Sequence, residues 1–108
     1  MTISELCSVL DAKVLSLPDE TREVNGVYIG DLLSWVMGRA QCDNVWITIM
    51  SNINVIAVAS LSDVSCVLLA EDVSLDDEIL NTAKQKGINI LSTPLAAFET
   101  AVQISGMI

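Results

Sequence analysis

Polar side chains stand at the ends of three predicted strands, where a small ligand could be bound. These side chains and the glycine beside them are Gly30, Asp31, Thr48, Asn52, Asn54, Ser92 and Thr93. One arginine, Arg22, lies just before the first of the three strands. Turns that lead into helix N-termini expose backbone N–H groups that attract anions, and a guanidinium pairs well with phosphate or carboxylate. The chemistry predicted is recognition of a small anionic or nucleotide-like ligand.

The same residues also have a purely structural explanation. Asn52, Asn54 and Thr93 belong to the residue types preferred as helix N-caps. Arg22 is also close in sequence to acids with which it could form a surface ion pair of small energetic value. These acids are Glu20, Glu23 and Asp31. From the sequence alone, ligand binding and structural roles both stay open.

Catalytic machinery is poorly represented in the chain. It has no histidine, the commonest general base, and neither a G-x-S-x-G motif nor a G-x-x-x-x-G-K-[ST] phosphate loop. Cys7, Cys42 and Cys66 are far apart, whereas zinc sites need closely spaced ligands. The acids at 71–78 lack the alternate spacing of a calcium loop. We therefore predict a protein that is not an enzyme and uses no metal or cofactor. An enzyme with paired carboxylates is the least favoured alternative.

Length and charge narrow the class of protein further. The 108 residues predict a single domain, 1–108, and 14 acidic against five basic residues give a net charge of −9. Such a charge disfavours nucleic acid and anionic membranes, because both are bound through Lys and Arg. No apolar run is long enough to span a bilayer, and no signal peptide is visible. A cytoplasmic protein is therefore expected.

The apolar content predicts self-association. At 52%, the apolar fraction exceeds the ~45–50% that is usual for soluble domains. A small apolar chain commonly buries part of its surface in a two-fold dimer, so we expect a homodimer. Trp35, Met37 and Met50 are candidate interface residues, since aromatic residues and Met are enriched at interface cores. Packing in the core of the domain itself is the alternative.

Alternating strand and helix patterns predict an α/β fold. The predicted strands are 14–16, 24–29, 45–50, 64–69 and 88–91. The predicted helices follow Thr2 and cover 32–37, 55–61, 75–86 and about 94–104. From residue 45 onward the order is strictly strand then helix, which predicts a mainly parallel sheet with helices on both faces. The first half is expected to add one or two edge strands.

Local signals mark the expected helix ends. The N-terminal signals are capping boxes at Thr2–Glu5 and Ser74–Asp77, an N-cap at Asp31, and an N-cap at Thr93 followed by Pro94. The C-terminal signals are Gly38 and Gly87. Gly26 interrupts the second strand, where a glycine indicates a bulge or a close backbone approach.

Four segments carry a family resemblance. They are Arg22–Gly26, Gly30–Leu33, Trp46–Thr48 and Gly87–Thr93. Together they resemble the DRTGG domain over nearly the whole chain. In the motif that gives the family its name, Arg22 and Gly26 fit, whereas Glu23 and Asn25 differ. The closing Gly-Ile-x-Ile-Leu-x-Thr is also similar to the N-terminal domain of HPr kinase/phosphorylase, whose α/β fold is like the N-terminal domain of the Mur ligases.

The resemblance implies a regulatory function. DRTGG domains occur beside CBS domains and in some phosphotransacetylases, and they are treated as ligand-sensing modules without an established reaction. No catalytic residues are therefore carried over to this chain. We predict a non-catalytic regulatory or ligand-sensing module that binds a small anionic or nucleotide-like ligand and acts through a partner enzyme. A pure interaction or assembly subunit without any small-molecule ligand is the alternative.

Overall fold

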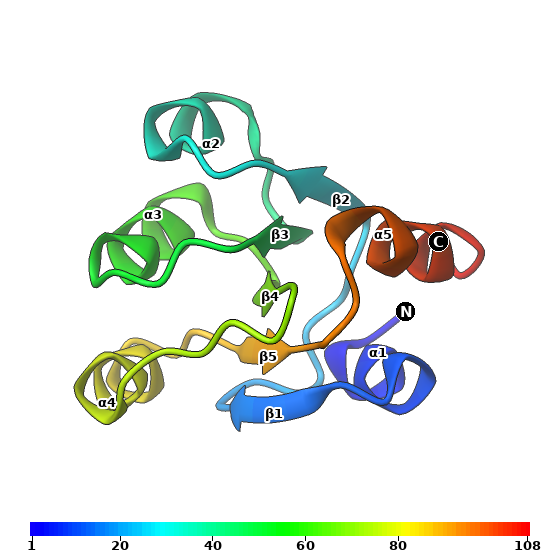
Figure 1. The fold of residues 1–108 in the computed structure, drawn as a ribbon, viewed down its shortest axis with the longest axis horizontal. Helices are drawn as coiled ribbons and strands as arrows, with labels where there is room; N and C mark the ends of the chain where they lie inside the picture. Colours follow the sequence, from blue (N-terminus) through cyan, green and yellow to red (C-terminus); the bar gives the residue numbers. More distant parts are fainter.

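Five strands and five helices build the fold in a computed structural model that describes residues 1–108. The strands are β1 (Lys13–Ser16), β2 (Gly26–Ile29), β3 (Asn44–Thr48), β4 (Cys66–Leu69) and β5 (Ile90–Ser92). The helices are α1 (Ile3–Leu10), α2 (Leu33–Arg39), α3 (Asn54–Ser62), α4 (Asp77–Gln85) and α5 (Ala97–Ser105). Helices α2, α3 and α4 cover one face of the sheet, and α1 and α5 cover the other (Figure 1).

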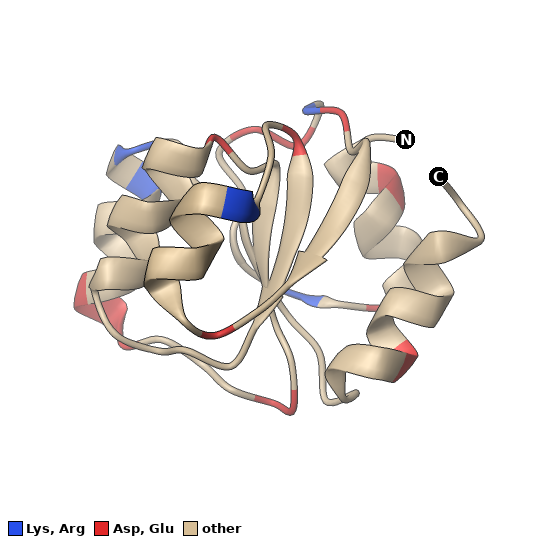
Figure 2. Ribbon diagram, turned by 90° about the horizontal axis from the view of Figure 1, so that it is seen from above, with Lys and Arg blue, Asp and Glu red and all other residues tan.

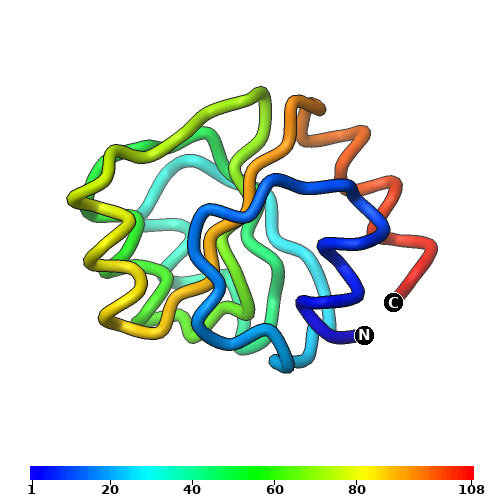
Figure 3. Tube along the Cα trace, turned by 90° about the horizontal axis from the view of Figure 1, so that it is seen from below, coloured from blue at the N-terminus to red at the C-terminus, as the bar shows by residue number.

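The sheet is mixed, with the strand order β1-β5-β4-β3-β2. Strands β2 to β5 pair in parallel, because a helix returns the chain to the same end of the sheet before each new strand. Strand β1 pairs antiparallel with β5. The chain then crosses along 17–25 to begin β2 at the far edge (Figure 3). The α/β class is confirmed, and both strands of the first half are edge strands, as predicted.

The sheet is buried on both faces, which explains why its central strands are almost entirely apolar. Toward α2, α3 and α4, Trp46 is fully buried, and its indole Nε1 donates a 2.8 Å hydrogen bond to the carbonyl oxygen of Gly30. Toward α1 and α5, Ile47 and Leu68 pack with the apolar side of α1. Two separate cores therefore hold the strands in register, and the buried Cys66 lies in the second of them.

Two predicted helix ends are confirmed. Thr2 and Glu5 form a reciprocal capping box at the start of α1. Gly87 follows α4 with φ of +73°, the left-handed conformation that favours glycine after a helix. At the other end of α4, the predicted capping box is wrong in register. Asp76 is the N-cap, and its Oδ1 accepts from the backbone N–H of Ile79 at 3.0 Å.

Three further predicted ends are wrong. Asp31 does not cap α2, whose N-cap is Leu32, because its carboxylate is engaged by the end of β3. Gly38 lies inside α2, which continues to Arg39. Thr93 does not cap α5, since its Oγ1 accepts from the N–H of Leu95 in a tight turn, and the helix begins only at Ala97. Gly26, in turn, begins β2 and does not interrupt it.

Charge and termini complete the description of the surface. Acidic residues lie on helices and loops around the whole molecule and are not gathered on one face (Figure 2). The two termini lie on the same side, beside α1 and α5. None of the five helices is both long and apolar enough to cross a membrane.

Candidate functional site

Asp31 and Thr48 are brought together at the carboxyl ends of β2 and β3, where the sequence predicted part of the ligand site. The hydroxyl of Thr48 donates a 2.8 Å hydrogen bond to Asp31 Oδ1, which also accepts from the N–H of Ile49 at 3.0 Å. The N–H of Met50 donates to Thr48 Oγ1 at 3.2 Å. The polar atoms of this pair are thus engaged in joining two adjacent turns.

The crevice expected in such a fold lies between β4 and β5. Open α/β sheets bind ligands where neighbouring connections leave toward opposite faces, and here β4 leads to α4 whereas β5 leads to α5. The two loops close this crevice with their own backbone. The N–H of Glu71 donates to the carbonyl of Leu95 at 2.9 Å, and the N–H of Asp72 donates to that of Thr93 at 2.9 Å. The amides that would bind an anion are therefore occupied.

Other predicted residues at the carboxyl ends of the strands also form hydrogen bonds within the chain. The hydroxyl of Ser92 donates to the carbonyl of Val73 at 3.1 Å, and Asn52 Oδ1 accepts from the N–H of Asn54 at 2.9 Å. Among the predicted ligand residues, Asn52 alone lines an open cavity of about 640 Å³, which lies between the turn after β3 and the start of α4. That cavity also presents Asp76 and Glu78, so it disfavours an anionic ligand.

Arg22 lies at the amino ends of the parallel strands, opposite to the carboxyl ends that carry the other predicted residues. The structure therefore does not bring Arg22 together with them. Its Nε donates to Asp43 Oδ1 at 3.1 Å, and a terminal nitrogen donates to Asp63 Oδ1 at 2.8 Å and to the Asp63 carbonyl. Asp43 and Asp63 precede β3 and β4 at their amino ends. The expected pairing with Glu20, Glu23 or Asp31 is therefore wrong.

The contacts around Arg22 shift the pKa values of Arg22, Cys42 and Asp63. Partial burial acts to lower the pKa of the Arg22 guanidinium, but the hydrogen bonds to Asp63 and Asp43 outweigh it and raise that pKa. The thiol of Cys42, 3.2 Å from Asp63 Oδ2, and then the guanidinium of Arg22 lower the pKa of Asp63. The same hydrogen bond to Asp63 raises the pKa of the Cys42 thiol. Arg22 therefore forms ion pairs with two carboxylates and fastens 17–25 across the amino ends of β3 and β4.

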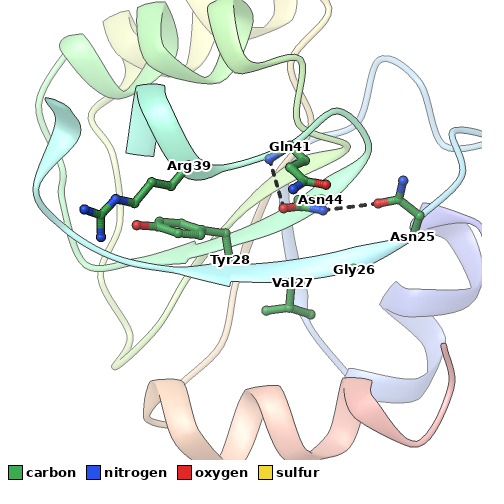
Figure 4. Close-up of a pocket in the computed structure, with 7 residues that line it drawn as sticks. All are labelled: Asn25, Gly26, Val27, Tyr28, Arg39, Gln41 and Asn44. Atoms are coloured by element: carbon green, nitrogen blue, oxygen red, sulfur yellow. Dashed lines mark hydrogen bonds between the residues drawn. The ribbon is translucent and has the colours of Figure 1, made fainter. Parts of the chain in front are cut away.

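An open pocket of about 320 Å³ lies beside the free edge of β2 (Figure 4). We call it the Arg39 pocket, and its lining residues are Asn25, Gly26, Val27, Tyr28, Arg39, Gln41 and Asn44. Two of its amide side chains are joined to each other and to the backbone. The backbone N–H of Gln41 donates to Asn44 Oδ1 at 3.0 Å, and Asn44 Nδ2 donates to Asn25 Oδ1 at 3.2 Å.

Two glycines give the Arg39 pocket its shape. A β-carbon on Gly26 would lie 3.1 Å from Asn44 Nδ2, so glycine lets that amide approach the strand. A β-carbon on Gly30 would lie 2.9 Å from the ring of Tyr28, so glycine leaves space for that ring beside the pocket. Gly30, predicted as a ligand residue, is placed to act through Tyr28.

The guanidinium of Arg39 supplies the charge of the pocket. It lies in the last turn of α2, with its Cζ 3.6 Å from the ring centroid of Trp35, in a cation–π contact. The ion pairs of the molecule involve Arg22 and the N-terminus, so Arg39 has no carboxylate partner. An exposed cation in an acidic chain is thus held in place and left available to an anion.

Comparison with known proteins identifies the family. The profile of the DRTGG domain matches residues 5–107. The chain belongs to the DRTGG domain family. No curated protein matches the sequence. Among solved structures, the fold is similar to the CBS and DRTGG domains of the regulatory region of Clostridium perfringens pyrophosphatase, complexed with its activator, diadenosine tetraphosphate. The TM-score is 0.78 at 15% identity, over 95% of this chain and 45% of that chain.

The likeness confirms the fold of this DRTGG domain, whereas the predicted similarity to HPr kinase/phosphorylase stays a prediction. Sequence reasoning missed the Arg39 pocket because Gly38 was interpreted as the end of α2, which put Arg39 in a loop. The signal that could have found it is the spacing of Trp35 and Arg39. Residues four apart lie on one helical face, so the pair is placed to stack once the helix extends past Gly38.

Proposed function

We propose that this DRTGG domain is a non-catalytic regulatory module that binds a small anionic, nucleotide-like ligand in the Arg39 pocket. The observation that carries the proposal is the unpaired guanidinium of Arg39 beside Tyr28 and three amide side chains in an open pocket. A guanidinium is suited to a phosphate group. Amides offer donors and acceptors to the edge of a base or to a ribose, and a phenol ring offers a surface for stacking.

Size and the related regulatory region support this proposal. Ligand pockets commonly measure about 300–1,000 Å³, and the Arg39 pocket lies at the lower end of that range. The regulatory region with the similar fold was solved with a nucleotide activator. The set predicted from the sequence at the carboxyl ends of the strands is less favoured, because its polar atoms are engaged within the chain. We further propose that the module is a homodimer and acts on a partner enzyme.

Thermal shift with a panel of adenine nucleotides, diadenosine polyphosphates and inorganic phosphate tests the ligand. A ligand that binds the folded state stabilises it by RT ln(1 + [L]/Kd), so a binder raises the melting temperature. Arg39→Gln should abolish the shift. Lys84→Gln is the matched control, since it removes the same charge from an exposed site on α4. A flat response of the wild-type protein to every compound at millimolar concentration would contradict the proposal.

A pure interaction subunit is the second candidate. It is favoured by the large apolar side chains left exposed on α2, α3 and α5, of which Phe98 and Leu61 are about three-quarters exposed, at 73% and 74%. In that case a partner protein would be recovered in stoichiometric amount by both the wild-type chain and Arg39→Gln. No nucleotide would then change either the melting temperature or the recovery.

A further inference from the structure

The two edges of the sheet differ in how they are protected against pairing with another strand. Strand β1 carries Lys13 and a register shift between Val14 and Ser16, and both features discourage a further strand from adding. Strand β2 carries no charge and no proline, and it pairs only with β3. Its outer backbone groups therefore lie on an edge that lacks the charge and the register shift of β1.

Exposed apolar side chains flank β2 on the α5 face of the sheet. Helix α5 packs against β2 and β3 on this face, and its buried side chains are Thr100 and Ile104. Phe98 and Val102 are each two residues from Thr100 and lie about 160° around the helix from it. They therefore lie on the exposed side of α5, the helix that packs against β2. Ile29, two residues beyond the inward-facing Val27, adds a third apolar side chain on the same face.

The other face of β2 is flanked in the same way by α2. Leu32, the N-cap of α2, and Trp35 within it are both more than half exposed, and Trp35 stacks on Arg39 of the pocket beside β2. From residue 26 to residue 40 the chain carries only Asp31 and Arg39, so its net charge there is zero, whereas the whole chain carries −9. This surface is where a second acidic copy meets the least repulsion.

The apolar area is sufficient for a stable contact. Five side chains, Ile29, Leu32, Trp35, Phe98 and Val102, are each between 49% and 73% exposed. Taking about 150–250 Å² for a fully exposed large side chain, they offer roughly 500 Å². A standard interface buries about 800 Å² on each partner, of which about 60% is apolar, or roughly 500 Å². The two areas agree.

We propose that the free edge of β2 is where a second copy of this chain docks, with the two β2 strands antiparallel about a two-fold axis perpendicular to the sheet. This operation keeps each face on its own side, so α5 lies beside α5 of the second copy and α2 beside its α2. Phe98 and Val102 then meet their own equivalents. A second copy fits better than an extended peptide, because a lone strand would leave both flanking helices uncovered.

Sedimentation or light scattering of the ligand-free protein tests the surface, using variants that keep the fold. The wild-type chain should have twice the monomer mass of 11.6 kDa at micromolar concentration. Phe98→Glu on one flank and Leu32→Glu on the other should each raise the dimer dissociation constant at least about tenfold, because each places a charge in an apolar contact. Leu61→Glu is the matched control, since Leu61 is exposed on α3 away from this edge.

The proposal rests on the proposed homodimer and not on the proposed ligand, so the two can fail separately. A wild-type monomer overturns it. A dimer that survives Phe98→Glu or Leu32→Glu, or one that Leu61→Glu weakens as much, overturns it as well. Circular dichroism and melting temperature check that each variant is folded. If no nucleotide raises the melting temperature but the dimer forms and is weakened by Phe98→Glu and Leu32→Glu, only the proposed ligand is contradicted.

Discussion

The two arginines of this chain show how one residue type serves two purposes. Arg22 donates hydrogen bonds to the carboxylates of Asp43 and Asp63 and to the Asp63 carbonyl. These partners are 21 and 41 residues away in the sequence. It fastens a long crossing segment where three chain stretches meet. Arg39 makes no ion pair and stacks on Trp35 at the rim of a pocket. Only Arg39 retains a charge that is available to a ligand.

The Arg22 contacts predict how acid weakens the fold. The Cys42 thiol and the Arg22 guanidinium lower the pKa of Asp63 in the folded state. These contacts therefore stabilise the protein above the usual carboxyl pKa of about 4, and the stabilisation is lost as pH falls through the lowered folded value. Asp63→Asn keeps the left-handed backbone that Asn tolerates. It should lower the free energy of unfolding at pH 7 by less than about 1 kcal/mol, since the side chain is largely exposed.

Urea unfolding of both proteins across the acid range measures this difference. The two curves of stability against pH should converge once the pH falls below the lowered folded pKa of Asp63, where the wild-type carboxyl group is protonated as well. Asp11→Asn is the control, because Asp11 ends α1 in the same conformation without an ion pair. A gap between wild type and Asp63→Asn that persists unchanged into acid would show that the charge of Asp63 is not its source.

At the scale of elements, α2 gives the sharpest test of the local structure. Gly38 lies inside this helix, and a β-carbon there would meet no atom within 4 Å. Glycine in a helix interior costs about 0.5–1 kcal/mol relative to alanine, so Gly38→Ala should raise the free energy of unfolding by up to that amount. Gly87→Ala should lower it by about 1 kcal/mol, because residue 87 has φ of +73°. Denaturant titration measures both changes in the free energy of unfolding. A lower free energy of unfolding for Gly38→Ala would contradict a helix α2 that continues to Arg39.

The element order, the edge position of the first two strands, the start of α1 and the end of α4 followed from local patterns in the sequence. What escaped prediction depends on contacts between distant segments. Asp31 has the residue type of a cap, yet the end of β3 engages its carboxylate. The amides of Glu71 and Asp72 follow a strand as ligand-binding amides do, yet a loop more than twenty residues later occupies them. Local propensity contains no information on which distant segment will form a hydrogen bond with a given polar atom.

At the scale of the whole molecule, unequal coverage of the sheet defines the surfaces available to partners. Three helices cover one face and two cover the other, so the edge at β2 is bordered by side chains that no further element covers (Figure 1). The same edge forms one wall of the Arg39 pocket. A second copy docked there would stand beside the proposed ligand site, so ligand binding and assembly would be coupled directly in the proposed regulatory module.

The net charge of −9 predicts how salt affects that assembly. Two copies repel at long range, while the proposed contact is apolar and nearly free of charge, so screening removes repulsion and little attraction. Raising the ionic strength from about 0.01 M to about 0.1 M shortens the Debye length from about 30 Å to about 10 Å. The dimer dissociation constant should therefore fall several-fold, as sedimentation equilibrium would measure. An interface held by ion pairs gives the opposite sign, so a dimer that salt weakens would place the contact on the charged surface and away from β2.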